Sequence, residues 1–388
     1  MAQTKNNEIE MLRAFSIMLV VLSHIPFYLP WESAVWGPLF QRANFWFGVD
    51  IFFVISGYVV TTSLLREITP GARPARILAS FAIRRAYRLL PLSWTVLATV
   101  LVLSLIWYKT EVFGSFYGNL SDAVAVLFYS ANWHFYECAT KAVEPCGIHQ
   151  GLYWSLSLEE QFYIVLPLVI VFARKYLMAI CIGGMLLQLP LDRDIHSALW
   201  ITRTDALLVG VLIALCRNNN PGSLLFKPDF LRNDAVRIPL LVFILTGMAL
   251  LAAGSVVSFS VSLIALGGGA LVWAASFNEG LLLRKQHSVL VWIGSRSYAI
   301  YLLHNIAFIS SKVLLAGIVG DRDKIGAHAY SISLVVVGLG LTAVLAELSA
   351  RYLEKPLQKH GRRIAERLRN PIAIPTEETP LPVLRVAG

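Results

Sequence analysis

Two ionisable residues stand eleven positions apart inside one long apolar run of this sequence. They are Arg13 and His24, in the run LRAFSIMLVVLSH. Eleven residues make close to three helical turns, so both side chains project from nearly one face, about 16 Å apart along the axis. A charge inside a membrane helix costs at least about 2.5 kcal/mol. We therefore expect this face to look into a helix bundle, although His24 alone is also compatible with a structural histidine.

A second candidate site is the group of arginines Arg84, Arg85 and Arg88, which comes just before another apolar run. Arg84 and Arg88 share a helical face, and so do Arg85 and Arg88. Guanidinium groups bind phosphates through paired hydrogen bonds, so the cluster indicates a phosphate-bearing ligand. The alternative is anchoring to lipid headgroups. Arg296, near the same side of a later apolar run, is a further candidate.

Carboxylates begin two other apolar runs. Asp50 lies in GVDIFFVISGY, at a depth that His24 can share. Two interpretations are open: Asp50 fixes the tautomer of the histidine, or it faces the positive end of its own helix dipole. Glu159 and Glu160 lie in YWSLSLEEQFY. One glutamate suits the dipole of a first helical turn, and the second is expected to need a polar cavity.

Two further motifs carry polar groups into the bundle. RTDALLVG contains Arg203 and Asp205, which either bind substrate or pair across the bundle. In SRSYAIYLLHN, Tyr298, Tyr301 and His304 recur every three residues and share one helix face. The candidates thus form two levels, with arginines toward one membrane surface and acid–base groups deeper. The first level suits a phosphate-bearing ligand and the second suits proton transfer.

Long apolar blocks must position these motifs. The 388 residues are 56% hydrophobic and 15% charged, whereas soluble domains are about 25% charged. A helix of roughly 20 apolar residues crosses the hydrocarbon core. The sequence therefore predicts an all-α polytopic membrane bundle of about ten transmembrane helices. The predicted spans are 10–30, 46–65, 90–108, 153–173, 176–191, 198–216, 236–254, 257–276, 289–314 and 328–350. The shorter segment 120–133 is expected to be re-entrant or interfacial, or else an additional partial span.

Lysine and arginine are concentrated near the termini and in alternate loops, above all in 66–88. By the positive-inside rule, both ends of the chain are expected in the cytoplasm. This topology accounts for most of the net charge of +9, so no nucleic-acid partner is predicted. The first apolar block lacks a cleavage site and is interpreted as a true span. Residues 1–355 are expected to form the membrane domain. Residues 356–388 are expected to form a cytoplasmic tail, basic and then proline-rich, that is disordered at its end.

The cysteines fit this topology. Cys138 and Cys146 fall in the loop 109–152, which is expected outside the cytoplasm. In an oxidising compartment they are expected to form a small disulfide, and the alternative is two free thiols. Cys181 and Cys216 lie in or beside predicted spans and are interpreted as small apolar residues.

In these motifs the sequence resembles the acyltransferase 3 family of bacterial membrane acyltransferases. The similarity comprises, in the order found in the family, LRAFSIMLVVLSH, GVDIFFVISGY, RRAYRLLP, YWSLSLEEQFY, RTDALLVG, SYAIYLLH and the closing EKP at 354–356. It covers nearly the whole membrane part. Some members carry a fused extracytoplasmic hydrolase-like domain, and this chain is expected to be a member without one.

The resemblance implies transfer of an acyl group, often acetyl, from cytoplasmic acyl-CoA to a hydroxyl of a glycan, glycolipid or similar acceptor. It places the protein in the bacterial cytoplasmic membrane, in contact with membrane lipids and without a metal. The residues expected to bind the coenzyme A phosphates are Arg13, Arg84, Arg85, Arg88 and Arg296. His24 is expected to act as general base or acyl carrier, with Asp50 orienting it. Tyr298, His304 or Arg203 is expected to stabilise the oxyanion. Glu160 completes the catalytic candidates, and the acceptor-binding candidates are Glu159, Arg203 and Asp205.

The competing interpretation is a secondary transporter or proton-coupled flippase for a glycan or lipid precursor. Such a protein would also place arginine, histidine and glutamate inside a bundle. It would move its substrate without consuming a thioester, and it would usually show internal repeats, which this sequence does not. A scaffold without chemistry does not explain why one helix carries Arg13 and His24 on one face.

Overall fold

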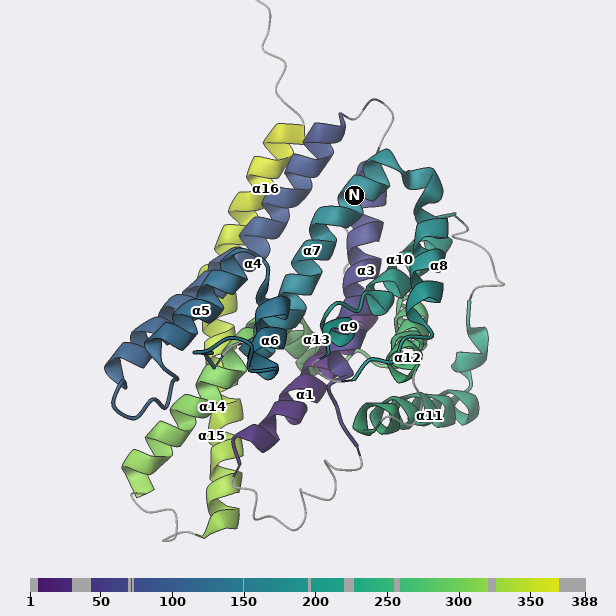
Figure 1. Cartoon of the computed structure of the whole chain (residues 1–388). Coiled ribbons are helices and arrows are strands. Elements are labelled where there is room, and N and C mark those ends of the chain that lie inside the picture. Colours follow the sequence, from purple (N-terminus) through teal and green to yellow (C-terminus); the bar gives the residue numbers. More distant parts are fainter. Residues whose placement is uncertain are drawn as a thin grey trace, which may run out of the picture.

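The computed structural model describes residues 6–29, 43–68, 71, 73–148, 150–194, 197–219, 227–254, 259–319 and 326–369. All the regular structure in these ranges is helical (Figure 1). The helices before residue 190 are α1 (Asn7–His24), η1 (Ile25–Phe27), α3 (Gly48–Glu67), α4 (Pro74–Ile106), α5 (Phe116–Leu127), α6 (Ala131–Ala139), α7 (Gln150–Phe172), η2 (Arg174–Tyr176) and α8 (Leu177–Gln188). Those after it are α9 (Ala198–Ile201), α10 (Asp205–Asn219), η4 (Asp229–Arg232), α11 (Asp234–Ala253), α12 (Ser260–Ala275), α13 (Ser288–Ser295), α14 (Ser297–Val319), α15 (Ala327–Leu348), η6 (Ser349–Glu354) and α16 (Lys355–Arg369).

Eight helical segments in the described ranges are long and apolar enough to cross a membrane. They are Asn7–Phe27, Gly48–Glu67, Pro74–Ile106, Gly151–Phe172, Ala198–Asn218, Asp234–Ala253, Ser297–Val319 and His328–Arg369. The chain is therefore an all-α polytopic membrane protein, as its apolar blocks predict.

Two of the ten predicted spans are shorter helices in the structure. The span predicted at 176–191 is α8, whose 12 residues extend only about 18 Å. It ends just before Pro190, which cannot continue the hydrogen-bond ladder. The span predicted at 257–276 is α12, with 16 residues. The count of about ten thus included two apolar blocks whose helices fall short of the usual membrane-crossing length.

The segment predicted at 120–133 does not form one helix. It is divided between α5 and α6, with a break at residues 128–130. Inside a bundle the polar backbone groups of such a break need partners. Gln161 of α7 supplies them by donating to the Tyr129 carbonyl at 2.7 Å and to the Asn132 side chain at 3.0 Å. Ser157 accepts from the Ala131 amide at 3.2 Å. The segment is therefore not one continuous span, and its re-entrant or interfacial placement stays a prediction.

Helices α3 and α10 pack closely through two glycines. A Cβ added to Gly57 would collide with the Leu207 carbonyl oxygen, and one added to Gly210 would collide with the Val54 carbonyl oxygen. Small residues allow such close approach in membrane helices. This contact brings the motifs GVDIFFVISGY and RTDALLVG together, although they are about 150 positions apart in the sequence.

The C-terminal helix leaves the bundle beside the start of α4. Helix α15 continues through the π-helical turn η6 into α16, and Figure 1 shows α16 alongside the first part of α4 at one end of the molecule. The basic beginning of the predicted tail is therefore helical to Arg369. Its proline-rich end, residues 370–388, lies outside the described residues.

Candidate active site

A cavity of about 680 Å³, its mouth included, lies among helices α1, α3, α4, α7 and α14. Three of the predicted phosphate-binding arginines line it: Arg13 from α1, and Arg85 and Arg88 from α4. Glu159 is the carboxylate among its lining residues. The charged residues that line the cavity are therefore mostly positive. The three arginines come from two different helices, α1 and α4.

The contacts of these groups leave the positive charge available. Both oxygens of Glu159 accept hydrogen bonds, from Ser56 at 2.8 Å and from Tyr163 at 3.1 Å. Arg13 pairs with Glu10 one helical turn earlier, at 3.0 Å. In the part of the chain that the structure describes, Arg85 and Arg88 form no ion pair. The cavity is thus suited to bind an anion.

Arg85 is held by an aromatic ring rather than by a carboxylate. Its guanidinium carbon lies 4.4 Å from the centre of the Tyr163 ring, and the Tyr163 hydroxyl donates to Glu159. A guanidinium stacked on a ring keeps its N–H groups free at the edge. Tyr163 and Ser56 are functional candidates that the sequence reasoning missed. The signal for Tyr163 was its position one helical turn after Glu159 in the same motif.

Two other predicted phosphate-binding arginines have carboxylate partners elsewhere. Arg84 donates to Glu67 and to Ser80, both at 2.5 Å. Arg296 donates to Glu347 at 2.5 Å. Neither lines the cavity. Consecutive helical residues point about 100° apart, which accounts for Arg85 lining the cavity while Arg84 does not. A phosphate-binding role for Arg84 and Arg296 gains no support from this cavity and stays a prediction.

A second cavity of about 500 Å³ adjoins the first and contains Glu160. Leu89, Leu156, Glu159 and Tyr298 line both cavities. The Tyr298 hydroxyl donates to the Leu89 carbonyl at 2.6 Å. Tyr129, at the break between α5 and α6, also lines the second cavity. The expectation that the second glutamate needs a polar cavity agrees with this arrangement.

His24 and His304 lie side by side and do not line either cavity, but Tyr301, which lines the first, has its ring centre 6.2 Å from that of His304. The ring centres of His24 and His304 are 5.1 Å apart. His24 Nδ1 lies 2.8 Å from the Val20 carbonyl oxygen, and His304 Nδ1 lies 3.0 Å from that of Ile300. A carbonyl oxygen only accepts, so Nδ1 carries the proton in each ring. In a neutral ring Nε2 is then the basic nitrogen, which gives His24 the tautomer of a general base.

Asp50 and Asp205 each have an arginine partner in another segment, which agrees with the interpretation that Arg203 and Asp205 pair across the bundle. Asp50 accepts from Arg203 through both carboxylate oxygens, at 3.1 and 3.0 Å, and both side chains are fully buried. Asp205 pairs with Arg193 at 2.8 Å and accepts from Ser262 at 2.9 Å. The expected contact between Asp50 and His24 is therefore not formed, because a buried carboxylate needs a countercharge and Arg203 supplies one.

Comparison with known proteins adds an independent line of evidence. A family model described as an acyltransferase domain matches residues 6–347. The chain belongs to this acyltransferase family. O-acetyltransferase OatA of Staphylococcus aureus is 27% identical over 381 residues, which cover 90% of this chain and 57% of the relative. Peptidoglycan O-acetyltransferase OatA of Listeria monocytogenes is 28% identical over 384 residues, covering 91% and 56%. The chain thus spans a little over half the length of these relatives, and no solved structure matches it.

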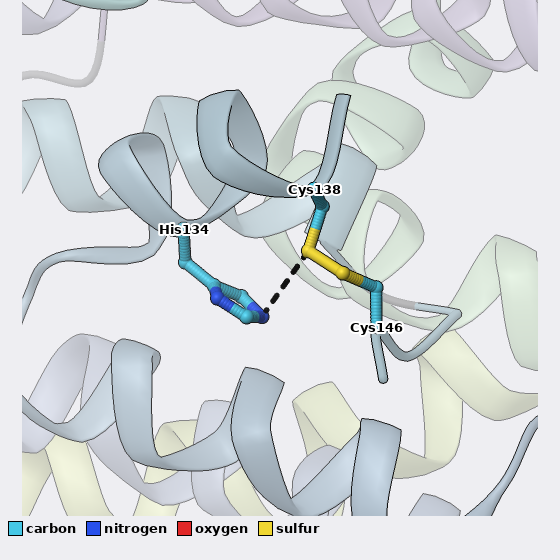
Figure 2. Close-up of side chains that lie close together, drawn as sticks. All are labelled: His134, Cys138 and Cys146. Atoms are coloured by element: carbon cyan, nitrogen blue, oxygen red, sulfur yellow. Dashed lines mark hydrogen bonds between the residues drawn. A yellow bond between two sulfur atoms is a disulfide. The ribbon is translucent and has the colours of Figure 1, made fainter. Parts of the chain in front are cut away.

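The matched region of the acyltransferase family includes the loop that carries the cysteines. Cys138 and Cys146 form a disulfide, as their place in an outer loop predicted (Figure 2). His134 points toward this bridge, with Nε2 3.6 Å from the Cys138 sulfur and 3.0 Å from an Asp122 oxygen. Both sulfur atoms are used by the bridge, so this cluster closes a loop and is not a set of metal ligands in this state.

Proposed function

We propose that this chain is a membrane O-acyltransferase of the bacterial cytoplasmic membrane. It moves an acyl group, such as acetyl, from acyl-CoA to a hydroxyl of a glycan, glycolipid or similar acceptor. The observation that carries the proposal is the cavity lined by Arg13, Arg85 and Arg88, in which two guanidinium groups lack an ion pair with any described residue. The relatives named as O-acetyltransferases support acetyl as the acyl group and oxygen as the acceptor atom.

Coenzyme A carries phosphates at one end and the thioester at the end of a long arm. The phosphates bind the three guanidinium groups, which offer several N–H donors in forked geometry. His24 lies eleven residues beyond Arg13 on α1, about 16 Å along the helix. The pantetheine arm is about that long, so it carries the thioester from the arginines toward the histidine pair.

His24 then acts as general base. Its Nε2 removes the proton of the acceptor hydroxyl while the oxygen attacks the thioester carbonyl, and the tetrahedral intermediate collapses with release of the coenzyme A thiolate. The protonated imidazole returns its proton to that thiolate. General base catalysis of this kind contributes roughly 10²- to 10⁴-fold in rate. His304, 5.1 Å from His24 between ring centres, is placed to donate to the oxyanion or to exchange the proton.

Purified protein with labelled acetyl-CoA tests the proposal, with release of the free thiol as the readout. His24→Ala should lower thiol release by roughly 10²- to 10⁴-fold, because the base is lost. Gln161→Glu is not a suitable control, since Gln161 holds the break between α5 and α6. Gln188→Ala removes a polar side chain that hydrogen-bonds Gly184 and Thr204 and makes no hydrogen bond to the histidine pair, and it should keep the parent rate.

Equal thiol release by the parent and by His24→Ala would contradict the catalytic assignment. Transport of a glycan precursor without thiol release would favour the transporter alternative. Mass spectrometry of cell-surface glycans, with and without the intact gene, identifies the acceptor as the species that loses the mass of one ester.

A further inference from the structure

The chain just after His24 is tied to α14. His24 is the last residue of α1, and the short turn η1 leads from it to Tyr28. The Tyr28 hydroxyl donates to Asn305 Oδ1 at 2.7 Å, and its ring stacks on Phe308 with centres 4.9 Å apart. Helix ends open more readily than helix centres unless they are anchored. The position of His24 therefore depends on the Tyr28 anchor.

Asn305 connects this anchor to the loop that follows the disulfide. It comes directly after His304 on α14 and is only 7% exposed. Its Nδ2 donates to the Ile148 carbonyl at 3.0 Å, while its Oδ1 accepts from Tyr28. One amide group thus joins the turn after α1, helix α14 and the loop before α7, and it uses a donor and an acceptor to do so.

The loop that presents the Ile148 carbonyl is held by several contacts. The Gly147 amide donates to Asp122 at 3.0 Å, and the Ile148 amide donates to Asn119 at 3.2 Å. A Cβ at Gly147 would collide with the Asp122 carboxylate, so glycine is needed there. The disulfide closes the loop one residue before Gly147, with His134 beside the bridge (Figure 2), and His134 also contacts Asp122 at 3.0 Å.

We propose that Asn305 is a positioning residue for the His24–His304 pair, and that the Cys138–Cys146 disulfide acts on the pair through it. The inference rests on the proposed function. Opening the disulfide removes one of the restraints on the loop that presents the Ile148 carbonyl, which weakens its hydrogen bond with the Asn305 amide and, through Asn305, the Tyr28 anchor. The two imidazole rings lose their mutual placement. The arginine-lined cavity shares none of these contacts, so donor binding is unaffected.

Kinetics with labelled acetyl-CoA test this coupling. Asn305→Ala should lower kcat roughly tenfold to a hundredfold, because small displacements of catalytic groups have effects of that size. The KM for acetyl-CoA should not change. Tyr28→Phe keeps the ring stack, loses the hydroxyl and should show a smaller fall. Gln188→Ala, which also removes a part-buried amide, is the matched control and should behave as the parent.

Reduction of the disulfide tests whether its effect on the histidine pair passes through Asn305 or is independent of it. A trialkylphosphine converts the disulfide into two thiols and becomes the phosphine oxide, with water supplying the oxygen and the protons. Reduction should lower the kcat of the parent by about the factor seen in Asn305→Ala, and it should have little further effect on that variant. If reduction lowered the kcat of Asn305→Ala by the same factor as that of the parent, the proposal would be overturned. An unchanged kcat in both Asn305→Ala and Tyr28→Phe would also overturn it.

Chemical reactivity of His24 gives a readout that needs no acyl transfer. Diethyl pyrocarbonate modifies imidazole, and mass spectrometry of peptides reports the rate at His24. That rate should change in Asn305→Ala and after reduction of the parent, and it should stay constant in Gln188→Ala. A constant rate in all samples would overturn the coupling even in an active enzyme. A responsive His24 in a protein that transfers no acyl group would retain the coupling and reject the proposed function.

Discussion

Arg203 and Arg88 both lie within the helix bundle, yet their surroundings differ in kind. Arg203 is fully buried, binds Asp50 through two hydrogen bonds and lies within 5.1 Å of the ring centres of Trp46, Trp154 and Trp200. Arg88 borders an open cavity and has no ion pair among the described residues. The charge of Arg203 is already compensated by Asp50, whereas the charge of Arg88 is left for a ligand.

This difference separates a structural charge from a binding charge. Burial alone does not identify a site, because the most deeply buried arginine is the one with its requirements met. Sequence motifs do not separate the two kinds either, since RTDALLVG and RRAYRLLP both contain arginine in apolar surroundings. Whether an arginine is structural or free to bind a ligand depends on its ion-pair partners, and these come from helices distant in sequence.

The largest effect is expected when the ion pair between Arg203 and Asp50 is broken. Arg203→Leu leaves Asp50 buried without a countercharge and should lower the free energy of unfolding by about 3–5 kcal/mol. Thermal unfolding in detergent measures the change. The double variant Arg203→Leu with Asp50→Leu should recover part of the loss, because the uncompensated carboxylate is gone.

The folded fraction of Arg203→Leu should still bind acetyl-CoA as the parent does. An unfolding midpoint equal to that of the parent, together with lost acyl transfer at unchanged acetyl-CoA binding, would instead support the sequence-based assignment of Arg203 to the acceptor site.

The cavity arginines should show the opposite pattern. Arg88→Ala should weaken binding of coenzyme A by about 1.5–3 kcal/mol, the usual range for a hydrogen bond to a charged group, and leave the unfolding midpoint nearly unchanged. Calorimetric titration in detergent measures the affinity. Added salt should weaken binding to the parent in the same direction.

Arg84→Ala is the matched control for this prediction. It removes a guanidinium from the same helix, one turn away, but that group is bound to Glu67 and does not line the cavity. Its affinity for coenzyme A should stay close to that of the parent. Equal losses in both variants would mean that the general charge of this surface matters more than the cavity.

The sequence predicted the membrane class and the helical architecture, because both follow from local composition and spacing. It did not predict that Arg203 binds Asp50, since that contact joins helices about 150 residues apart through the close packing at Gly57 and Gly210. It also missed the aromatic support of Arg85 by Tyr163. Spacing shows which residues share a helix face, and only tertiary packing shows what that face meets.

The smallest effect is expected at Arg296. It tests whether an arginine that already has a carboxylate partner can also bind a ligand. This arginine was predicted to bind phosphate, yet it pairs with Glu347, whose side chain is 37% exposed, and it lies over the ring of Trp292. Partly exposed ion pairs contribute about 0–1 kcal/mol to stability. Arg296→Gln should therefore change the unfolding midpoint slightly and coenzyme A affinity hardly at all. A loss of affinity as large as that of Arg88→Ala would show that an existing carboxylate partner does not exclude a ligand role. The contrast between compensated and uncompensated arginines would then fail as a guide to the site.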